Sequence, residues 1–292
     1  FKTRTSIPAE TLDKTTRAKY PTRMAVQDDL KNILVKLGFT NTRAQEIASK
    51  IQVDPARGSG HAWGAESRDQ KSLLRTRIFE NGMDYKGYNI AVHEFGHNVE
   101  QTISLQDVDY YMLKGVPNTA FTEALAFMFQ KNDLKLLGMK DNNAMQKHYD
   151  ALDNFWSLYE IAGVSMVDIA TWKWLYDNPG TSAVELKDAV NRIAIEIWNK
   201  YYAPVFGVKD QPVLAIYSHM INTPLYLPNY AYGHIIEFQL AEYIKDKNFA
   251  TEIERIFSLG RLTPQQWMKE AVGSKISVEP VLNATNEALG NL

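Results

Sequence analysis

The sequence of 292 residues contains no cysteine. This absence excludes disulfide frameworks, thiolate zinc sites, iron–sulfur clusters and cysteine nucleophiles. It leaves the compartment undetermined, because a chain without cysteine is insensitive to the redox environment. Any zinc site in this chain must therefore be built from imidazole and carboxylate groups.

The sequence also lacks an excess of charge of either sign, with 32 basic and 34 acidic residues and a formal net charge of -2. A protein that binds nucleic acid through its phosphates is expected to carry a basic excess, so we expect no nucleic-acid partner. No apolar run approaches the roughly 20 residues of a membrane-spanning helix. A hydrophobic content of 45% argues against disorder. We expect a soluble globular protein, either cytoplasmic or exported, and a first residue other than Met indicates a processed or partial chain.

Helical periodicity dominates the chain, whereas alternation at a period of two is scarce. This pattern predicts a mainly α fold with at most a small β-sheet. Residues 1–27 hold few large apolar side chains and are predicted to form a polar, loosely packed arm before one helical domain over residues 28–292. The predicted helices are Asp28–Leu37, Thr40–Ile51, Tyr88–Leu105, Phe121–Leu137, Asn143–Ala162, Met166–Tyr176, Ser182–Tyr202 and Tyr230–Ile244.

The strongest chemical signal is the sequence His-Glu-Phe-Gly-His at residues 93–97, early in a predicted helix. A spacing of four residues places His93 and His97 on one helical face, where two imidazole nitrogens can converge on one cation. Glu94 is offset from that face, so it can approach an activated water as a general base. Composition alone predicts about 0.007 occurrences of this pattern in the chain. We therefore predict a zinc site that includes His93 and His97.

A catalytic zinc ion needs a third protein ligand, and Glu123 is the best candidate. It lies in the segment Phe121–Phe129, which is apolar on nearly every side. A carboxylate is costly to bury there unless a cation neutralises it. The alternatives are that Glu123 faces a water-lined cleft or pairs with a lysine.

These motifs resemble the gluzincin zinc metallopeptidases, and more narrowly the group of thimet-type oligopeptidases and angiotensin-converting enzyme. The resemblance covers residues 58–244 and implies a helical zincin-like metallopeptidase domain with one zinc ion per chain, held by His93, His97 and Glu123. It also implies that His61 and Ala62 lie on an edge strand that binds the substrate backbone. Peptides are the implied substrates, and Glu94 is the implied general base.

Downstream segments extend the resemblance. His219 and a tyrosine, either Tyr230 or Tyr232, are implied to stabilise the oxyanion of the transition state. His219 and His61 could instead serve only as hydrogen-bonding groups in loops, and either tyrosine could belong to the core. The sequence alone does not separate Tyr230 from Tyr232.

Three departures from the family pattern bear on function. An acidic residue that orients a metal-bound imidazole is replaced by Phe127. Tyr217 stands where the carboxy-dipeptidases have a lysine for the substrate carboxylate. Family members are also longer, with an N-terminal half that forms the opposite wall of the cleft. The alternative functions are therefore a non-catalytic peptide- or protein-binding module, or half of a cleft completed by a second copy, another chain or a missing N-terminal segment.

Overall fold

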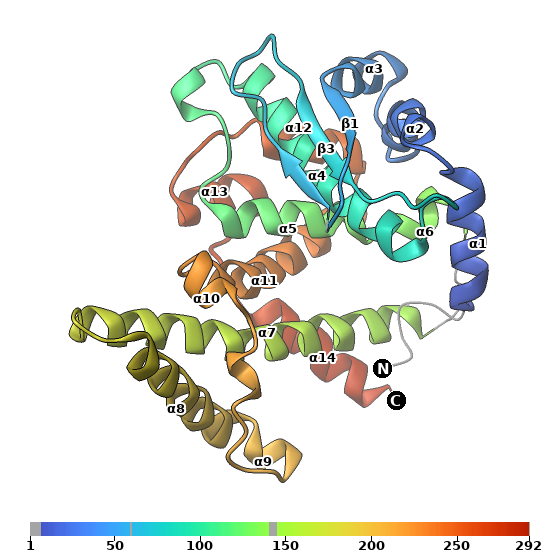
Figure 1. Ribbon diagram of the computed structural model, residues 1–292. Coiled ribbons are helices and arrows are strands. Elements are labelled where there is room, and N and C mark those ends of the chain that lie inside the picture. Colours follow the sequence, from blue (N-terminus) through green and yellow to red (C-terminus); the bar gives the residue numbers. More distant parts are fainter. Residues whose placement is uncertain (1–6, 59, 140–144, 292) are drawn as a thin grey trace.

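The computed structural model describes residues 7–58, 60–139 and 145–291 (Figure 1). Within these ranges the protein is mainly helical with one small sheet, which confirms the predicted fold class. No described helix combines the length and the apolar character that a bilayer span requires. The elements in chain order are α1 (Ala9–Lys19), α2 (Arg23–Lys36), α3 (Asn41–Ser49), β1 (Ile51–Pro55), β2 (His61–Trp63), β3 (Ser72–Thr76), α4 (Tyr85–Asp107), η1 (Tyr111–Leu113), α5 (Thr119–Gln130), α6 (Asp133–Leu136), α7 (Gln146–Asp177), α8 (Ala183–Tyr201), α9 (Ala203–Phe206), η2 (Val213–Ala215), α10 (His219–Asn222), α11 (Leu227–Ile244), α12 (Phe249–Phe257), α13 (Pro264–Val272) and α14 (Glu279–Gly290).

The three strands form a mixed sheet in the order β1-β3-β2. Strand β1 runs parallel to β3, and β2 pairs antiparallel with β3, with Ala62 opposite Leu74. Among the described residues β2 has a strand neighbour on one side only, so its other edge presents backbone groups that no strand pairs. The sheet lies against α4, and this contact places the edge strand β2 beside the predicted zinc-binding segment His93–His97.

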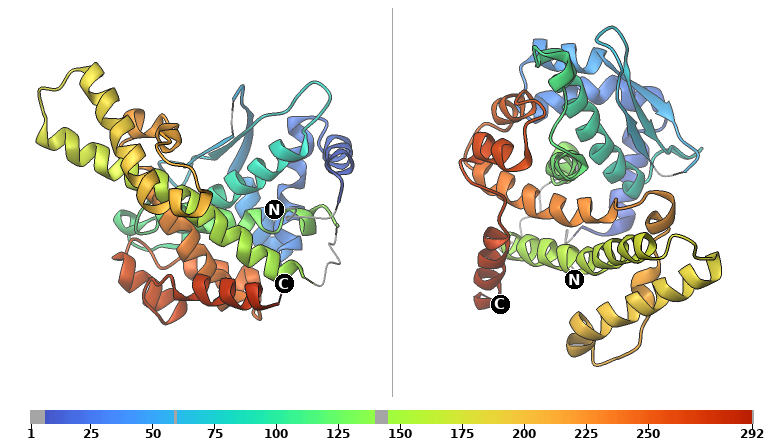
Figure 2. Two further views of the ribbon diagram at one scale, coloured as in Figure 1. Left: turned by 90° about the horizontal axis from the view of Figure 1, so that it is seen from below. Right: turned by 90° about the vertical axis from the view of Figure 1, so that its left-hand side faces the viewer.

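Helices α4, α5, α11 and α7 lie in successive layers below the sheet (Figure 1). One large apolar core joins the sheet, Tyr20 just after α1, and helices α2–α5 to α11 and the C-terminal helices α12 and α13. A second cluster lies between α7, α8 and the start of α11. Helices α7 and α8 form a hairpin that extends from the body of the molecule (Figure 2). The site residues therefore lie on helices anchored in the larger core.

The expectation of a loosely packed arm is wrong for residues 9–27. Residues 9–19 form α1 and residues 23–27 begin α2, so the predicted boundary at residue 28 falls inside a helix. Leu12 and Tyr20 are only 2% and 1% exposed, and Tyr20 stacks on Tyr88 of α4. Most of the large apolar residues of this segment are thus buried. Their low number had suggested a segment without packing contacts. Residues 1–6 of the predicted arm lie outside the described part of the chain.

Several predicted helix boundaries also differ. The segments predicted as Asn143–Ala162 and Met166–Tyr176 form the single helix α7, with residues 143 and 144 outside the described part. Gly163 lies in the middle of α7, where an added Cβ would overlap the Tyr202 hydroxyl. This glycine permits a close approach and does not end the helix. The predicted helix Phe121–Leu137 is divided into α5 and α6.

Helix α4 begins at Tyr85, three residues earlier than predicted, because the Asp84 side chain accepts a hydrogen bond from the Gly87 N–H at 2.8 Å. Its apolar face buries Phe95 and Val99 in the core. Gly96 faces α5, and a Cβ there would lie 3.0 Å from the Cα of Ala126. This close approach brings the zinc motif next to α5.

Substituting Gly96 should test the close approach. In Gly96→Ala the new methyl group meets the Cα of Ala126 and the Cβ of Phe129, neither of which can rotate away, so we expect the free energy of unfolding to fall by about 1–3 kcal/mol. Urea denaturation of the metal-free protein measures this loss. Gly290→Ala is the control, because an added Cβ there has no neighbour within 4 Å. Equal stability of Gly96→Ala and wild type would contradict the proposed packing constraint.

Candidate metal centre

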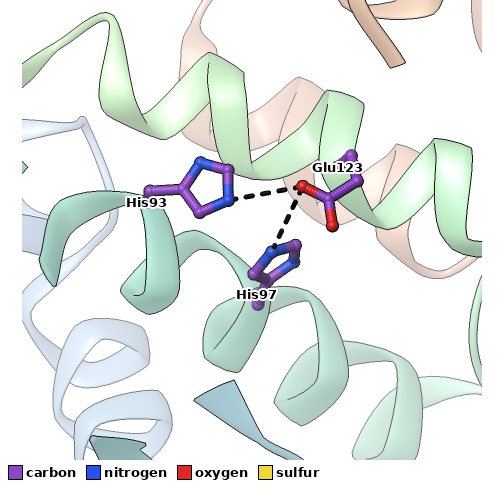
Figure 3. Close-up of side chains that lie close together, drawn as sticks. All are labelled: His93, His97 and Glu123. Carbon is purple, nitrogen blue, oxygen red and sulfur yellow. Dashed lines mark ion pairs between the residues drawn. The ribbon is translucent and has the colours of Figure 1, made fainter. Parts of the chain in front are cut away.

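The two histidines of α4 meet the carboxylate of α5 in the interior (Figure 3). The Oε2 atom of Glu123 lies 3.5 Å from the Nε2 atom of His93 and 3.9 Å from the Nε2 atom of His97. One potential ligand atom from each residue lies within 4.8 Å of those of the other two. Two imidazoles and one carboxylate are a donor set typical of a catalytic zinc site. The residues present therefore fit a zinc ion.

The protonation of these groups supports the fit. Burial favours the neutral form of His97 and lowers its pKa to about 4, with a smaller contribution from His93. Burial alone would raise the pKa of Glu123. A hydrogen bond from His93, the attraction of the histidines in their protonated forms and a hydrogen bond from Tyr226 outweigh burial, so the pKa of this carboxyl lies below its usual value. Neutral imidazole and ionised carboxylate are the forms that bind metal.

Glu123 receives a third contact from a residue that the sequence analysis missed. The Tyr226 hydroxyl, just before α11, donates a hydrogen bond to Oε1 of Glu123 at 2.9 Å. The Asp168 carboxylate of α7 fixes this turn by accepting hydrogen bonds from the backbone N–H groups of Leu225 and Leu227. Tyr226 precedes Tyr230 by four residues, and this helical spacing was the signal available in the sequence.

The Glu94 side chain lies between His93 and the edge strand β2. Burial raises the pKa of its carboxyl above the usual value, whereas the charge of His93 and a hydrogen bond from the Ala62 backbone oppose the increase. An added Cβ at Gly60 would lie 3.3 Å from the Cγ atom of Glu94. The predicted strand at His61–Trp63 is present as β2, and it borders the Glu94 side chain.

The two candidate tyrosines of α11 have different surroundings. The Tyr226 and Tyr230 rings lie 5.4 Å apart. Burial and the charge of Glu123 raise the pKa of Tyr230 to about 12, so its hydroxyl stays a hydrogen-bond donor at neutral pH. Tyr232 is 54% exposed. This arrangement favours Tyr230 as the tyrosine that faces the site.

His219 lies in the same cluster of aromatic rings as Tyr226 and Tyr230. Its ring lies 5.9 Å from that of Tyr226 and 6.2 Å from that of Tyr217. The Nδ1 atom is buried and has no hydrogen-bond partner within the described residues. His219 therefore lies next to the tyrosines that border Glu123, with hydrogen-bonding capacity that the described side chains leave unused.

The partner of His93 is a second residue that the sequence analysis missed. Gln130, at the end of α5, places its Oε1 atom 3.2 Å from the Nδ1 atom of His93. Phe127, where an acidic residue was expected, contacts the His93 ring at 5.2 Å between centroids and stacks on His234. Gln130 lies seven residues after Glu123, which places both on one helical face.

The sequence matches no protein-family model and no curated protein. A candidate peptidase from Chlamydophila abortus has a similar structure, with a TM-score of 0.60 at 13% identity over 94% of this chain and 47% of its own. For metallocarboxypeptidase 1 of Trypanosoma cruzi the TM-score is 0.55 at 13% identity, over 92% of this chain and 59% of its own. The M32 carboxypeptidase of Deinococcus radiodurans R1 gives 0.52 at 13% identity, over 98% and 67%.

These likenesses define the fold as that of the helical metallopeptidases. The chain spans about half of the first of these structures and up to two thirds of the last. The narrower resemblance to thimet-type oligopeptidases and angiotensin-converting enzyme stays a prediction.

One further carboxyl of α4 lies near the zinc motif. Glu100 is 1% exposed, and its Oε1 atom has no hydrogen-bond partner in the described ranges. Burial raises its pKa to about 8, although the charge of Arg261 opposes the increase. The folded protein therefore keeps a proton on Glu100 at neutral pH.

This proton predicts a specific pH dependence of stability. Between the ordinary carboxyl pKa of 4.5 and about 8, the folded state binds a proton at residue 100 that the unfolded state has lost. The stability that wild type has relative to Glu100→Gln should fall by about 1.4 kcal/mol per pH unit as the pH rises through this range, and then level off. Urea denaturation at several pH values, with chelator throughout, measures the difference. A difference independent of pH would show that Glu100 is not a buried neutral acid.

Proposed function

We propose that this chain hydrolyses peptide bonds with one zinc ion held by His93, His97 and Glu123. The observation that carries the proposal is the meeting of these three side chains from α4 and α5, with ligand atoms within 4.8 Å of one another. The helical metallopeptidase fold supports it. A zinc ion at this position would lower the pKa of a water molecule and polarise the scissile carbonyl group.

Glu94 is the proposed general base. Its carboxyl lies beside His93, and burial raises its pKa above the usual value. A base with a pKa nearer to the working pH transfers protons more effectively in both directions. Glu94 would take a proton from the attacking water and deliver it to the leaving amine.

The oxyanion of the tetrahedral intermediate would be stabilised by groups on the α11 side of the site. The Tyr230 hydroxyl keeps its proton, since burial raises its pKa to about 12. His219 would contribute a ring nitrogen from the cluster of aromatic rings that also contains Tyr226 and Tyr230. Donors that are already oriented before the reaction stabilise developing charge most effectively.

Substrate would bind along the free edge of β2. The backbone groups of the segment His61–Trp63 that face this edge can pair with an extended peptide, as a further strand would, with the Ala62 N–H exchanging its hydrogen bond to Glu94 for one to the substrate. This strand borders Glu94, so a peptide paired with it would pass close to the general base. A second chain or a further segment completing the opposite wall remains part of this proposal.

The function is tested by elemental analysis together with cleavage of a quenched-peptide library, with and without chelator. We expect one zinc ion per chain and cleavage that chelator abolishes. Absence of both zinc and cleavage would refute the proposal, whereas zinc without cleavage would favour the non-catalytic binding module.

Glu94→Gln separates catalysis from metal binding. The amide cannot accept the proton of the attacking water, so we expect kcat/KM for peptide cleavage to fall by at least about 100-fold. The zinc content should be unchanged, because the ligands are kept. Unimpaired cleavage by the zinc-loaded variant would remove Glu94 from the mechanism.

Tyr230→Phe and Tyr232→Phe form a matched pair. Loss of the Tyr230 hydroxyl should lower kcat by about 100-fold or more with little change in KM, as expected for a contact made in the transition state. Tyr232 is exposed, so its variant should retain wild-type kinetics. Steady-state kinetics on one peptide compares the two variants. The reverse result would reassign the role to Tyr232.

A further inference from the structure

A chain of hydrogen bonds runs from His93 away from the site. Gln130 lies 3.2 Å from Nδ1 of His93, and its Nε2 atom donates to Oδ1 of Asn89 at 2.6 Å. Asn89 Nδ2 in turn donates to Oδ2 of Asp133 at 2.6 Å. The chain thus joins α4, the end of α5 and the start of α6, and ends at a carboxylate that is 6% exposed.

Asp133 is held firmly at the end of this chain. Its Oδ2 atom also accepts a hydrogen bond from the Tyr85 hydroxyl at 2.6 Å, and its Oδ1 atom accepts from the Leu134 N–H at 2.6 Å. Its backbone carbonyl accepts from the Tyr88 hydroxyl at 2.9 Å. These contacts fix the carboxylate in position relative to α4.

The direction of every hydrogen bond in the chain follows from the carboxylate. An ionised carboxylate only accepts, so Asn89 must present its NH2 group to Asp133 and its oxygen to Gln130. Gln130 must then present its NH2 group to Asn89 and its oxygen to His93. An oxygen facing Nδ1 requires the imidazole proton on that nitrogen. With the proton on Nδ1, the Nε2 atom presents its lone pair toward the proposed ion. In the metal-free protein the Glu123 carboxylate, 3.5 Å from Nε2, favours a proton there and so opposes the selection made through Gln130.

We propose that Asp133 is a positioning residue that selects the metal-binding tautomer of His93 through Gln130 and Asn89. The proposal rests on the proposed zinc site, because the selected lone pair lies on the atom that would bind the ion. It also accounts for Phe127, since the acidic group absent from that position is present at Asp133, two amide side chains away from the imidazole. Hydrogen-bond partners of metal-binding histidines commonly change metal affinity by about 10–100-fold.

Asp133→Asn is the first test. The Leu134 N–H requires an oxygen at the Oδ1 position, so the new NH2 group takes the place of Oδ2 and faces Asn89. Both amides can then reverse, which presents an NH2 group to Nδ1 of His93 and moves the imidazole proton to Nε2. We expect the zinc dissociation constant, measured by competition with a chromogenic chelator, to rise by about 10–100-fold. Asp188→Asn, which removes an exposed acid from α8, is the control and should leave it unchanged.

The double variant Gln130→Glu with Asp133→Asn is the rescue. Here the new amide at position 133 donates to Asn89, and Asn89 donates to the new carboxylate at position 130. That carboxylate accepts the proton of His93 Nδ1 directly, so every hydrogen bond is again satisfied in the direction that leaves the lone pair on Nε2. We expect zinc affinity to return to within a few-fold of wild type. A merely structural role for Asp133 would give no recovery, and that outcome would overturn the proposal.

The tautomer itself can be observed without zinc or substrate. Two-bond 1H–15N spectra of the metal-free protein at about pH 8, above the ordinary titration range of histidine, distinguish Nδ1–H from Nε2–H. We expect a larger Nδ1–H population of His93 in wild type and in the double variant than in Asp133→Asn, in which Glu123 alone sets the tautomer. Equal populations in wild type and Asp133→Asn would overturn the proposal, even for a protein that binds zinc and cleaves peptides. The expected difference in a protein without cleavage would support it while the proposed function failed.

Discussion

The Glu123 carboxylate lies in the interior of the protein, on a helix whose neighbouring side chains are apolar. Burying such a charge is costly unless other groups compensate for it. Two imidazoles from α4 and one hydroxyl from the turn before α11 approach it. The arrangement of α4, α5 and α11 around one carboxylate therefore defines the site, and a divalent cation would complete the compensation.

The close packing of these helices depends on small residues at the contacts. Gly96 allows α4 to reach the backbone of α5, and Gly233 of α11 would place a Cβ 3.1 Å from the Cβ of Glu123. Glycine is otherwise unfavourable inside a helix, by roughly 1 kcal/mol relative to alanine. Both glycines lie next to the site. At these two positions the helices lose some intrinsic stability, and in exchange they can approach each other closely.

The local part of the site could be predicted from the sequence, whereas the contacts between distant segments could not. Helical spacing alone placed His93 and His97 on one face, and the apolar surroundings of Glu123 indicated a buried carboxylate. Gln130 and Tyr226 escaped notice because their helical spacing from Glu123 and Tyr230 indicates only a shared face, and their contacts depend on how α5 and α11 pack. The small number of apolar residues before Asp28 concealed the packing of α1 for a similar reason, because only the fold reveals which few of them are buried.

The hydrogen-bond chain to Asp133 has an electrostatic consequence for the proposed reaction. A carboxylate in direct contact with His93 would add negative charge close to the metal and weaken its attraction for a carbonyl oxygen. Two neutral amides transmit the direction of the hydrogen bonds from Asp133 while keeping its charge farther from the imidazole. Because histidines bind metal in their neutral form, Glu123 would be the one anionic ligand of the proposed site, and a divalent ion there would keep a net positive charge. The substitution of Phe127 for an acidic residue is therefore compatible with strong polarisation of the substrate carbonyl, because orientation of the imidazole and charge on the site are controlled by different residues.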